Sequence, residues 1–367
     1  MKSRIRLQDI ADMVGVSRTT VSNVLHGNTK RVSPETLDKI QKILKETLYQ
    51  PNIGSMMLSG KGSGIIGFAV GYEYIHGHPA LMDAFMSRLL SAVEEEAVKY
   101  GYYLMIIDGS EKERLVEIAS RWNVEGMIFI GFSEESYDIL RREINKKAIL
   151  VDTYTKQEEY TYQNVGIDDY DGGYQVGKYL RECGYPDALF IAESTRVRMN
   201  MGHGASGRKS IYGGPGLCNE KRWDGFKAAM EAGGTYCRRR RFIIVDQDME
   251  KRRQQYTEML PRFLEARALA MASDYNAIEI INFLRDHGIR VPEQISVTGF
   301  DDCIYAEYIR PRLTTVYQDV DNKGRTALRR LMKLIQGETL PQMHIMSPVK
   351  LIVRDSVLDH RITKITK

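Results

Sequence analysis

The strongest constraint on the fold is an alternation of short apolar segments with segments of helical periodicity, which starts at Ile65 and runs almost to the C-terminus. Such alternation is typical of parallel, doubly wound α/β sheets, in which helices cover both faces of the buried strands. It occurs as two series, so we expect two Rossmann-like lobes with a ligand cleft at the carboxyl ends of their strands. The expected strands are 65–70, 103–107, 127–130 and 148–151 in the first series, and 165–167, 188–192, 242–245, 269–271 and 296–298 in the second. The expected helices are 81–100, 112–121, 135–145, 172–183, 222–232, 253–266 and 275–287.

The composition is that of an ordinary globular protein. The 367 residues are 43% hydrophobic and 27% charged, which argues against a disordered or fibrous chain. No apolar run approaches the roughly 20 residues of a membrane helix, and residues 1–13 lack the apolar centre of a secretory signal, so we expect a cytoplasmic protein. The cysteines form no CxxC pair and are expected to be reduced thiols, without a disulfide or metal site: Cys183, Cys218, Cys237 and Cys303.

The net charge of +4 is unevenly distributed along the chain. Residues 1–63 hold ten Lys or Arg against five Asp or Glu, so the excess positive charge lies in this segment. A basic segment attached to a near-neutral body indicates a unit that binds a polyanion such as nucleic acid. A solvated basic surface is the alternative.

Helical periodicity in the same segment predicts an all-α helix-turn-helix unit. Leu7, Ile10, Ala11 and Val14 lie on one helical face, and Gly15 follows where a positive φ is needed. A second, short helix is expected at 18–25 after the N-cap Ser17, and it needs a partner to pack on. A third helix starts at Ser33-Pro34 and carries an apolar stripe of Leu37, Ile40, Leu44 and Leu48. Three helices in this order indicate nucleic-acid binding.

The second helix is expected to enter the major groove of DNA with its N-terminal residues near the bases. Arg18, Thr19 and Asn23 are candidates for base edges, because Arg pairs with guanine and Asn with adenine. Phosphate contacts suit Ser17, Thr20 and Ser22. For each of these residues, a polar side chain that simply faces solvent is the alternative.

Residues 51–63 are expected to connect the two parts of the chain. Asn52 can cap a short helix through Leu58, but Gly54 weakens that helix, so it is expected to fold only on a partner. Leu58 is then a candidate wedge into the minor groove. A plain linker remains the other interpretation.

Four N-terminal motifs closely resemble the lactose-repressor (LacI/GalR) family of bacterial transcription regulators: Asp9-Ile10-Ala11, Gly15-Val16-Ser17, Thr20-Val21-Ser22 and Tyr49-x-Pro51-Asn52. Further matches lie at Val165-Gly166-Ile167-Asp168, Arg222-x-x-Gly225-Phe226, Gly299-Phe300-Asp301-Asp302 and Pro311-x-Leu313-Thr314-Thr315. The hinge departs from the family at Gly54, Ser55 and Met56, although Leu58 matches the family's intercalating leucine.

The resemblance implies a homodimeric repressor that binds double-stranded operator DNA and a small-molecule effector, with a periplasmic-binding-protein-like body. The resemblance also implies that Arg6 contacts DNA, together with the candidates named above in the second helix and the hinge. The implied domains are a DNA-binding head at 1–50, a hinge at 51–63, a two-lobed body at 64–358 and a tail at 359–367. Lobe 1 would hold about 64–164 and 318–347, and lobe 2 about 165–317 and 348–358. The tail is too short for a tetramer-forming coiled coil, so we expect a dimer.

Effector candidates lie where expected strands end. Carboxylates and a fork-shaped guanidinium suit sugar hydroxyls, which both donate and accept hydrogen bonds, and aromatic rings can stack on the ligand. The candidates are Tyr72, Phe85, Asp152, Arg222, Ser273, Asp274 and Asp301, with Arg222 expected to begin a helix. Asp274 and Asp301 are alternatively helix caps. A carbohydrate is the expected effector, and a purine, nucleoside or acidic or phosphorylated sugar is the alternative.

The segment 194–221 is longer than the loop expected from the resemblance, and it is rich in glycine and basic residues. It either lines the effector site through Arg196, Arg198, Arg208 and Lys209, or it is a surface insertion. Its Gly202-x-Gly204-x-x-Gly207 run lies too far from a strand to predict a dinucleotide site. His76 and His78 are too few for a metal site. Because no nucleophile elbow, phosphate-binding loop or zinc motif occurs, we expect no enzyme, catalytic residue or cofactor.

Overall fold

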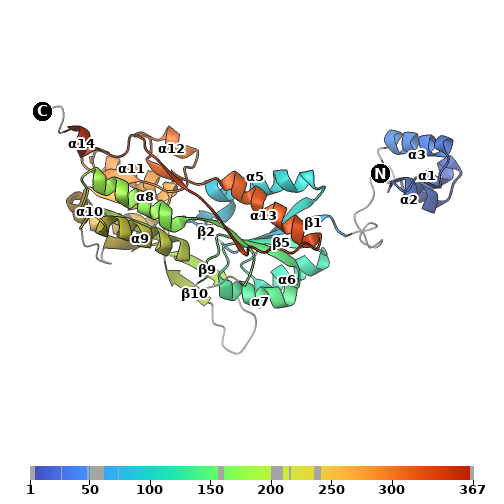
Figure 1. Cartoon of the computed structure of the whole chain (residues 1–367), viewed down its shortest axis with the longest axis horizontal. Helices are drawn as coiled ribbons and strands as arrows, with labels where there is room; N and C mark the ends of the chain where they lie inside the picture. The colour runs from blue at the N-terminus through green and yellow to red at the C-terminus, as the bar shows by residue number, and fades with distance from the viewer. Residues whose placement is uncertain are drawn as a thin grey trace. The chain divides into compact units, whose positions relative to one another are not determined.

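The computed structural model describes residues 5–25, 27–47, 49, 62–72, 74–155, 161–199, 210–214, 216–234 and 241–363. The chain forms two compact units, Met1–Ser63 and Gly64–Lys367, each with hydrophobic clusters of its own (Figure 1). We refer to them as the head and the large unit.

The described part of the head contains three helices: α1 (Leu7–Val14), α2 (Arg18–Leu25) and α3 (Pro34–Glu46). Their buried residues are Ile10, Ala11, Val21, Val24 and Ile40, one small cluster to which every helix contributes. The two short helices have few buried side chains each, so their stability depends on this shared cluster.

The first sheet of the large unit is parallel, with the strand order β15-β7-β6-β5-β1-β4. Its strands are β1 (Ile65–Val70), β4 (Tyr103–Asp108), β5 (Gly126–Ile130), β6 (Lys147–Val151), β7 (Asn164–Ile167) and β15 (His344–Ser347). Figure 1 shows α5 (Ala84–Lys99) and α13 (Val320–Ile335) on one face and α6 (Lys112–Arg121) and α7 (Glu134–Ile144) on the other. This sheet with its four helices is lobe 1.

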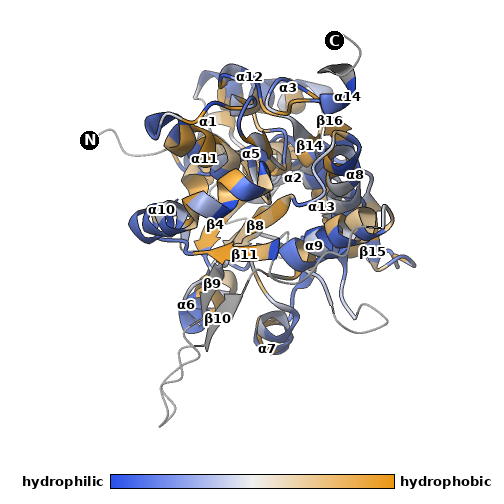
Figure 2. Ribbon diagram, turned by 90° about the vertical axis from the view of Figure 1, so that its left-hand side faces the viewer, coloured by the Kyte–Doolittle hydropathy of each residue, from blue (hydrophilic) through white to orange (hydrophobic). Residues whose placement is uncertain are grey.

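The second sheet is also parallel, in the order β11-β8-β12-β13. Its strands are β8 (Leu189–Glu193), β11 (Phe242–Val245), β12 (Ala268–Met271) and β13 (Ser296–Thr298), and its helices are α8 (Asp169–Glu182), α9 (Gly216–Glu231), α10 (Met249–Ala266) and α11 (Asp274–Asp286). Along β8, Phe190 packs in the cluster under α8 and α9, whereas Leu189 and Ile191 pack on the other side with α10 and α11. Successive side chains of a strand point to opposite faces, so lobe 2, formed by this sheet and its helices, has one apolar layer on each face of the sheet. Figure 2 shows that β8 and β11 of this sheet are hydrophobic in colour.

Close approach of α8 and α9 is a defining feature of lobe 2. A Cβ atom on Gly173 would lie 1.8 Å from the carbonyl oxygen of Arg222, and one on Gly225 would lie 1.8 Å from the carbonyl oxygen of Tyr170. Only glycine permits backbones to meet at this separation. These two glycines therefore set the position of Arg222 on α9.

Two expectations from the sequence are wrong in detail. The strand at 165–167, expected in the second series, belongs to the first sheet as β7, where it pairs with β6 and β15. A buried apolar strand fits either parallel sheet, so its composition did not distinguish them. Arg222 does not begin a helix but lies within α9.

Two hairpins were not expected. One joins β2 (Tyr74–Ile75) to β3 (His78–Pro79), and the other joins β9 (Thr195–Met199) to β10 (Ser210–Gly214). The second lies in the glycine-rich segment 194–221, which thus contains paired strands. The remaining short elements are η1 (Ala80–Met82), α12 (Tyr305–Tyr308), β14 (Thr315–Tyr317), α14 (His360–Thr363) and β16 (Lys350–Ile352), which pairs with β14.

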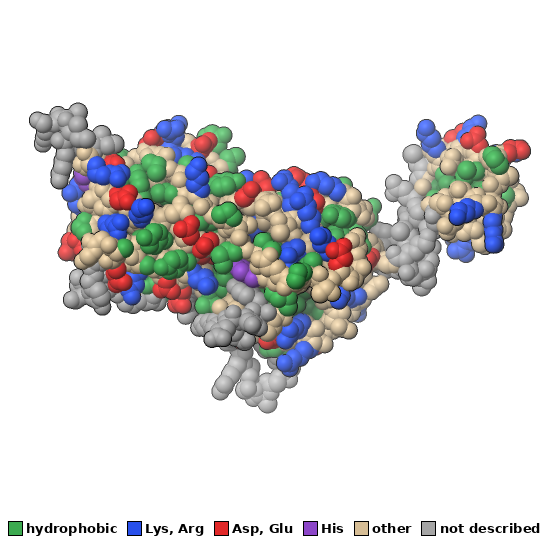
Figure 3. All heavy atoms as spheres, in the orientation of Figure 1, with side chains coloured by type: hydrophobic (Ala, Val, Ile, Leu, Met, Phe, Trp, Pro, Cys, Tyr) green, Lys and Arg blue, Asp and Glu red, His purple; other side chains and the backbone are tan. Residues whose placement is uncertain are grey.

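The visible face of the large unit intersperses basic and acidic side chains without one dominant sign (Figure 3). Within the described ranges, no helix has the length and apolarity needed to cross a bilayer.

Candidate functional site

The turn between α1 and α2 has the geometry of a helix-turn-helix. Gly15 adopts φ 75° at the end of α1, and the Val16 N–H donates to the Ala11 carbonyl at 3.0 Å. The left-handed residue ends the helix and redirects the chain. Ala11 and Val21 are fully buried where α1 and α2 cross, so the small Ala11 side chain permits the close contact.

Capping fixes the starts of the helices around this turn. The Thr20 N–H donates to Ser17 Oγ at 3.1 Å, and the Ser17 and Thr20 hydroxyls share a hydrogen bond of 2.9 Å. At α3, the Thr36 N–H donates to Ser33 Oγ at 3.3 Å. The Arg6 N–H donates to Asp9 Oδ2 at 2.6 Å at the start of α1.

The candidate DNA contacts differ in accessibility. The side chains of Arg18, Thr19 and Asn23 are exposed on α2, whereas Thr20 and Ser22 are half-buried. Ser17 and Arg6 are exposed beside the N-termini of α2 and α1. The two hinge candidates lie outside the described residues: Asn52 and Leu58.

A polar pocket of about 170 Å³ lies between the lobes of the large unit. Six of the seven effector candidates line it: Tyr72, Phe85, Asp152, Arg222, Ser273 and Asp301. Three of them lie shortly after the ends of strands: Asp152 directly follows β6, Ser273 lies two residues past β12, and Asp301 lies three residues past β13. The pocket thus occupies the edge where ligands bind in such sheets.

Arg222 is held rigidly in this pocket. Its Nε donates to Asp169 Oδ1 at 2.6 Å, its Nη1 donates to the Ala272 carbonyl at 2.6 Å, and its guanidinium carbon lies 3.6 Å from the centre of the Phe300 ring. Burial lowers the pKa of Arg222, but the carboxylates of Asp169 and Asp301 outweigh it and raise the pKa above its usual value. The group therefore stays charged and preorganised for a polar ligand.

Asp152 is paired with a lysine from the far end of the chain. Lys323 Nζ lies 2.8 and 2.7 Å from the two Asp152 carboxylate oxygens and donates to Gln318 Oε1 at 2.7 Å. The Lys323 side chain is fully buried. Burial raises the pKa of Asp152, and Lys323 opposes that rise.

Asp301 faces the same pocket from lobe 2. Gln318 Nε2 donates to its Oδ1 at 2.5 Å, so Gln318 connects Asp301 to Lys323. Asp301 has φ 117°, an unusual backbone conformation that orients the carboxylate and costs on the order of 1–3 kcal/mol. Burial raises the pKa of Asp301 to about 6, with Arg222 opposing the rise.

Asp274, the seventh candidate, does not line this pocket. Its Oδ1 accepts from Thr315 Oγ1 at 2.5 Å and its Oδ2 accepts from the Cys303 N–H at 2.7 Å. It borders a second, more apolar cavity of about 560 Å³. The helix cap is Ser273, whose Oγ accepts from the Asn276 N–H at 3.3 Å.

Several pocket residues were not identified from the sequence. His76, Asp83, Glu193, Asn276 and Gln318 line the pocket, and Asp169 and Lys323 hold its charged side chains. Glu193 ends β8, so its position at a strand end was an available signal. The local sequence around the other six does not indicate a place in the pocket, because their roles depend on distant partners.

Two of the four basic residues singled out in the segment 194–221 lie on a described strand. Arg196 and Arg198 lie on β9, which pairs with β10, and Arg208 and Lys209 lie outside the described residues. In the described ranges, no three His, Cys, Asp or Glu side chains gather as a metal site would require.

Comparison with known protein families gives one match in the head and one in the large unit. Residues 6–52 match the family described as "Bacterial regulatory proteins, lacI family", and residues 215–357 match "Periplasmic binding protein-like domain". The chain is 28% identical to the HTH-type transcriptional regulator DegA of Bacillus subtilis (strain 168), over 95% of this chain and 97% of DegA. It is 25% identical to the HTH-type transcriptional repressor PurR of Erwinia tasmaniensis, over 96% of this chain and 97% of PurR.

Solved structures agree with the architecture. The lac repressor dimer bound to operator and the anti-inducer ONPF aligns with a TM-score of 0.79 and 23% identity, covering 97% of this chain and all of that chain (100%). The transcriptional regulator CelR in complex with cellobiose aligns with a TM-score of 0.67 and 24% identity, covering 96% of this chain and 100% of that chain.

Proposed function

This chain belongs to the lacI family of bacterial regulatory proteins, and from that premise we propose that it is a repressor whose operator affinity is controlled by a carbohydrate bound between its lobes. The observation that carries the proposal is that Asp152 and Asp301, which follow strands, meet Arg222 of α9 in one pocket of a chain that also bears a helix-turn-helix head. The protein acts as a homodimer on a two-fold symmetric DNA site. It works in the cytoplasm, where operator DNA is, and it is not an enzyme.

The head supplies the DNA contacts in this proposal. Arg18, Thr19 and Asn23 read base edges, because their side chains are exposed on the helix that follows the turn. Arg6, Ser17, Thr20 and Ser22 bind phosphates, with Asn52 and Leu58 acting from the hinge. The proposed domains are the head at 1–50, the hinge at 51–63, the two-lobed body at 64–358 and the tail at 359–367.

The chemistry of the pocket favours a small polyhydroxylated ligand. Asp152 and Asp301 offer carboxylate oxygens to sugar hydroxyls, and Arg222 and Ser273 offer donors. Tyr72 and Phe85 supply ring faces for the apolar side of a sugar. A cavity of about 170 Å³ is below the usual size of drug-like sites, so a monosaccharide fits the proposal better than an oligosaccharide.

An acidic sugar is the second candidate. Among the described side chains that line the pocket, Arg222 is the permanently charged cation, and its guanidinium can pair with a ligand carboxylate or phosphate. Purines form a third class, for which the Tyr72 and Phe85 rings would provide stacking. Asp152 and Asp301 favour the neutral sugar, because two carboxylates repel an anion.

The test has two separate measurements. The full-length protein is first used to select binding sites from random duplex DNA, and we expect a two-fold symmetric consensus that Arg18→Ala weakens. Thermal melting is then measured with neutral monosaccharides, uronic acids, sugar phosphates and purines, since a bound ligand raises the melting temperature. A rise that Asp301→Asn abolishes would support the site, and selection of no DNA consensus would contradict the regulator.

A further inference from the structure

The hairpin β2–β3 of lobe 1 reaches across the cleft and contacts lobe 2. His76, at its turn, makes two hydrogen-bonding contacts with Glu193 of β8: its N–H donates to Oε1 at 3.2 Å, and its Nδ1 lies 2.5 Å from Oε2. The two residues are 117 positions apart and belong to different lobes. Such a two-point contact fixes orientation as well as distance.

A lobe 2 aromatic side chain supports the same histidine. The His76 ring stacks on Tyr275 of α11 with ring centres 4.4 Å apart and an angle of 1° between planes. His78 Nε2 lies 2.9 Å from the Tyr275 hydroxyl. On the hairpin backbone, Gln247 Nε2 donates to the Tyr74 carbonyl at 2.5 Å. The hairpin thus touches lobe 2 through both side chains and backbone.

Glu193 is itself anchored inside lobe 2. Asn276 Nδ2 donates to its Oε2 at 3.1 Å, and Arg252 Nη1 lies 3.7 Å from the same oxygen. The fully buried Arg252 side chain also donates to Glu279 Oε2 at 2.6 Å. His76 therefore binds a residue whose position is fixed by α10 and α11.

The turn that presents His76 has a demanding backbone. His76 has φ 56° and Gly77 has φ 82°, the pair of positive values found in two-residue hairpin turns that match strand twist. A left-handed conformation is uncommon for a residue other than glycine, and it persists where surrounding contacts offset its cost. The contacts with Glu193 and Tyr275 are of that kind.

His76 also separates two cavities. It lines the polar pocket of about 170 Å³ on one side and the more apolar cavity of about 560 Å³ on the other. Ile75, Asp83, Phe85 and Asp301 are shared by both linings. The hairpin thus forms part of the wall of the effector pocket as well as a bridge between lobes.

We propose that the β2–β3 hairpin is an interlobe latch, in which the contact of His76 with Glu193 sets the orientation of the lobes around the effector pocket. His76 is a positioning residue in this scheme. The inference rests on the proposed function only in naming the pocket that the latch regulates. Since the lobes rotate about their connections when a bridging contact changes, releasing His76 shifts the orientation that the unliganded protein adopts.

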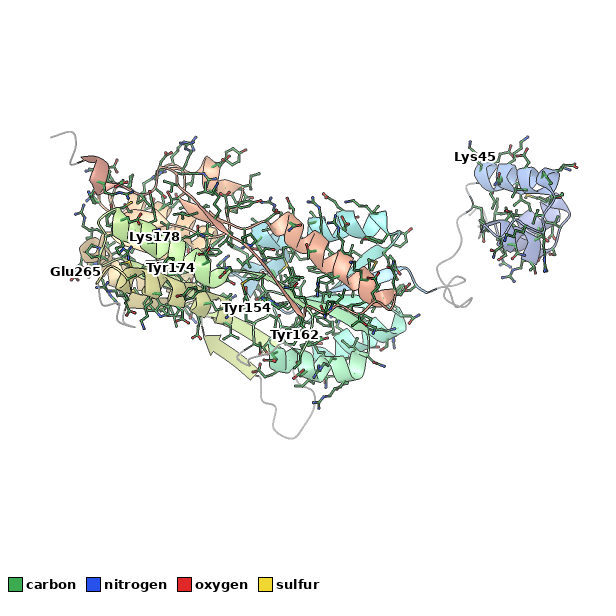
Figure 4. All side chains as sticks on the ribbon, in the orientation of Figure 1. Lys45, Tyr154, Tyr162, Tyr174, Lys178 and Glu265 are labelled. Carbon is green, nitrogen blue, oxygen red and sulfur yellow. The ribbon has the colours of Figure 1, made fainter. Side chains whose placement is uncertain are left out.

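The test measures lobe orientation directly, without DNA or effector. Two exposed residues, Glu113 of α6 in lobe 1 and Glu265 of α10 in lobe 2, are replaced by noncanonical residues that carry spin labels. Glu265 lies at the end of lobe 2 that is distant from lobe 1 (Figure 4). Labelled protein is diluted with unlabelled protein, so that distances within one protomer dominate. Electron–electron double resonance then gives the distribution of distances between the lobes.

We expect His76→Ala to broaden this distribution or to move its mean by more than about 2 Å, the scale of a domain rearrangement. His76→Gln keeps a side-chain donor and should restore part of the wild-type distribution. Tyr74→Ala is the matched control, since the Tyr74 side chain is exposed and its hairpin contact is made by the backbone. Circular dichroism and thermal melting establish that each variant is folded.

A wild-type distribution in folded His76→Ala would overturn the latch, and so would an equal change in Tyr74→Ala. If His76→Ala does not fold, Glu193→Gln is measured instead, because it weakens the same contact from lobe 2. An unchanged distribution in that variant would likewise overturn the latch. These readouts are independent of operator binding, so failure of the latch and failure of the repressor proposal remain distinguishable.

Discussion

Removing Lys323, the buried lysine that pairs with Asp152, should destabilise the large unit strongly. Lys323→Met keeps the side-chain volume but leaves Asp152 without the cation that lies 2.7 Å from its Oδ2. Lys323 is fully buried and the Asp152 side chain is 22% exposed, so solvent cannot replace the lost partner completely. Removing one member of a buried ion pair costs about 3–5 kcal/mol. Because Gln318 also loses a donor, we expect the upper part of that range.

The assay is thermal unfolding of the full-length protein, followed by circular dichroism at neutral pH. For a unit of this length, with about 2.1 cal/mol/K of unfolding entropy per residue, the loss corresponds to a fall in melting temperature of about 6–8 °C. Lys323→Met combined with Asp152→Asn removes the unpaired charge, so the double variant should be more stable than Lys323→Met alone. Wild-type stability in Lys323→Met, or no recovery in the double variant, would refute the ion-pair reasoning.

Gly173→Ala should destabilise lobe 2 by at least about 1–3 kcal/mol, because its Cβ would meet the Arg222 carbonyl. Lys178→Ala on the exposed side of α8 is the control in the same melting experiment. In the head, Ile40→Ala should cost about 2–5 kcal/mol and abolish DNA binding in a mobility-shift assay, while the melting of the large unit stays unchanged. Arg18→Ala should lose about 1–3 kcal/mol of discrimination at one base pair, seen as a relaxed consensus in binding-site selection. Burial raises the pKa of Asp301 in the folded state to about 6, which is above the ~3.9 of an unfolded aspartate. The folded state therefore binds the proton more tightly, and the free energy of unfolding rises as the pH falls from the folded pKa towards the unfolded pKa. The melting temperature of the wild type should therefore rise relative to that of Asp301→Asn as the pH is lowered from about 7 to about 5. A difference in melting temperature that stays constant over this range would contradict the raised pKa of Asp301.

The sequence predicted the parts of the fold that depend on local pattern. The strand and helix alternation gave the two sheets, since each buried strand is a short apolar run between amphipathic helices. Asp152, Ser273 and Asp301 were identifiable because residues after parallel strands meet at one edge of a sheet. Contacts between distant segments were not predictable in this way. Lys323 reaches Asp152 across 171 positions, and nothing in the α13 sequence marks it as the partner of a residue that lines the pocket.

The hairpin β2–β3 shows a different limit of sequence reasoning. Its strands have two residues each, too short for an alternating pattern to be recognised. The His76-Gly77 turn carries a signal, because glycine after a residue that tolerates positive φ favours such turns, but the signal does not reveal what the turn contacts. Its partners in lobe 2, Glu193 at the end of β8 and Tyr275 of α11, are brought to His76 by the tertiary fold.

The position of Arg222 in the pocket depends on the packing of lobe 2. Gly173 and Gly225 bring α8 and α9 together, and this brings the guanidinium to Asp169 at the start of α8. Asp169 in turn accepts a hydrogen bond from the hydroxyl of Tyr154, which follows β6 of lobe 1 (Figure 4). The chain Arg222–Asp169–Tyr154 thus crosses between the lobes beside the pocket that Arg222 lines, and His76–Glu193 is a second crossing. A ligand that competes for Arg222 perturbs this crossing, which gives effector binding a physical route to lobe orientation.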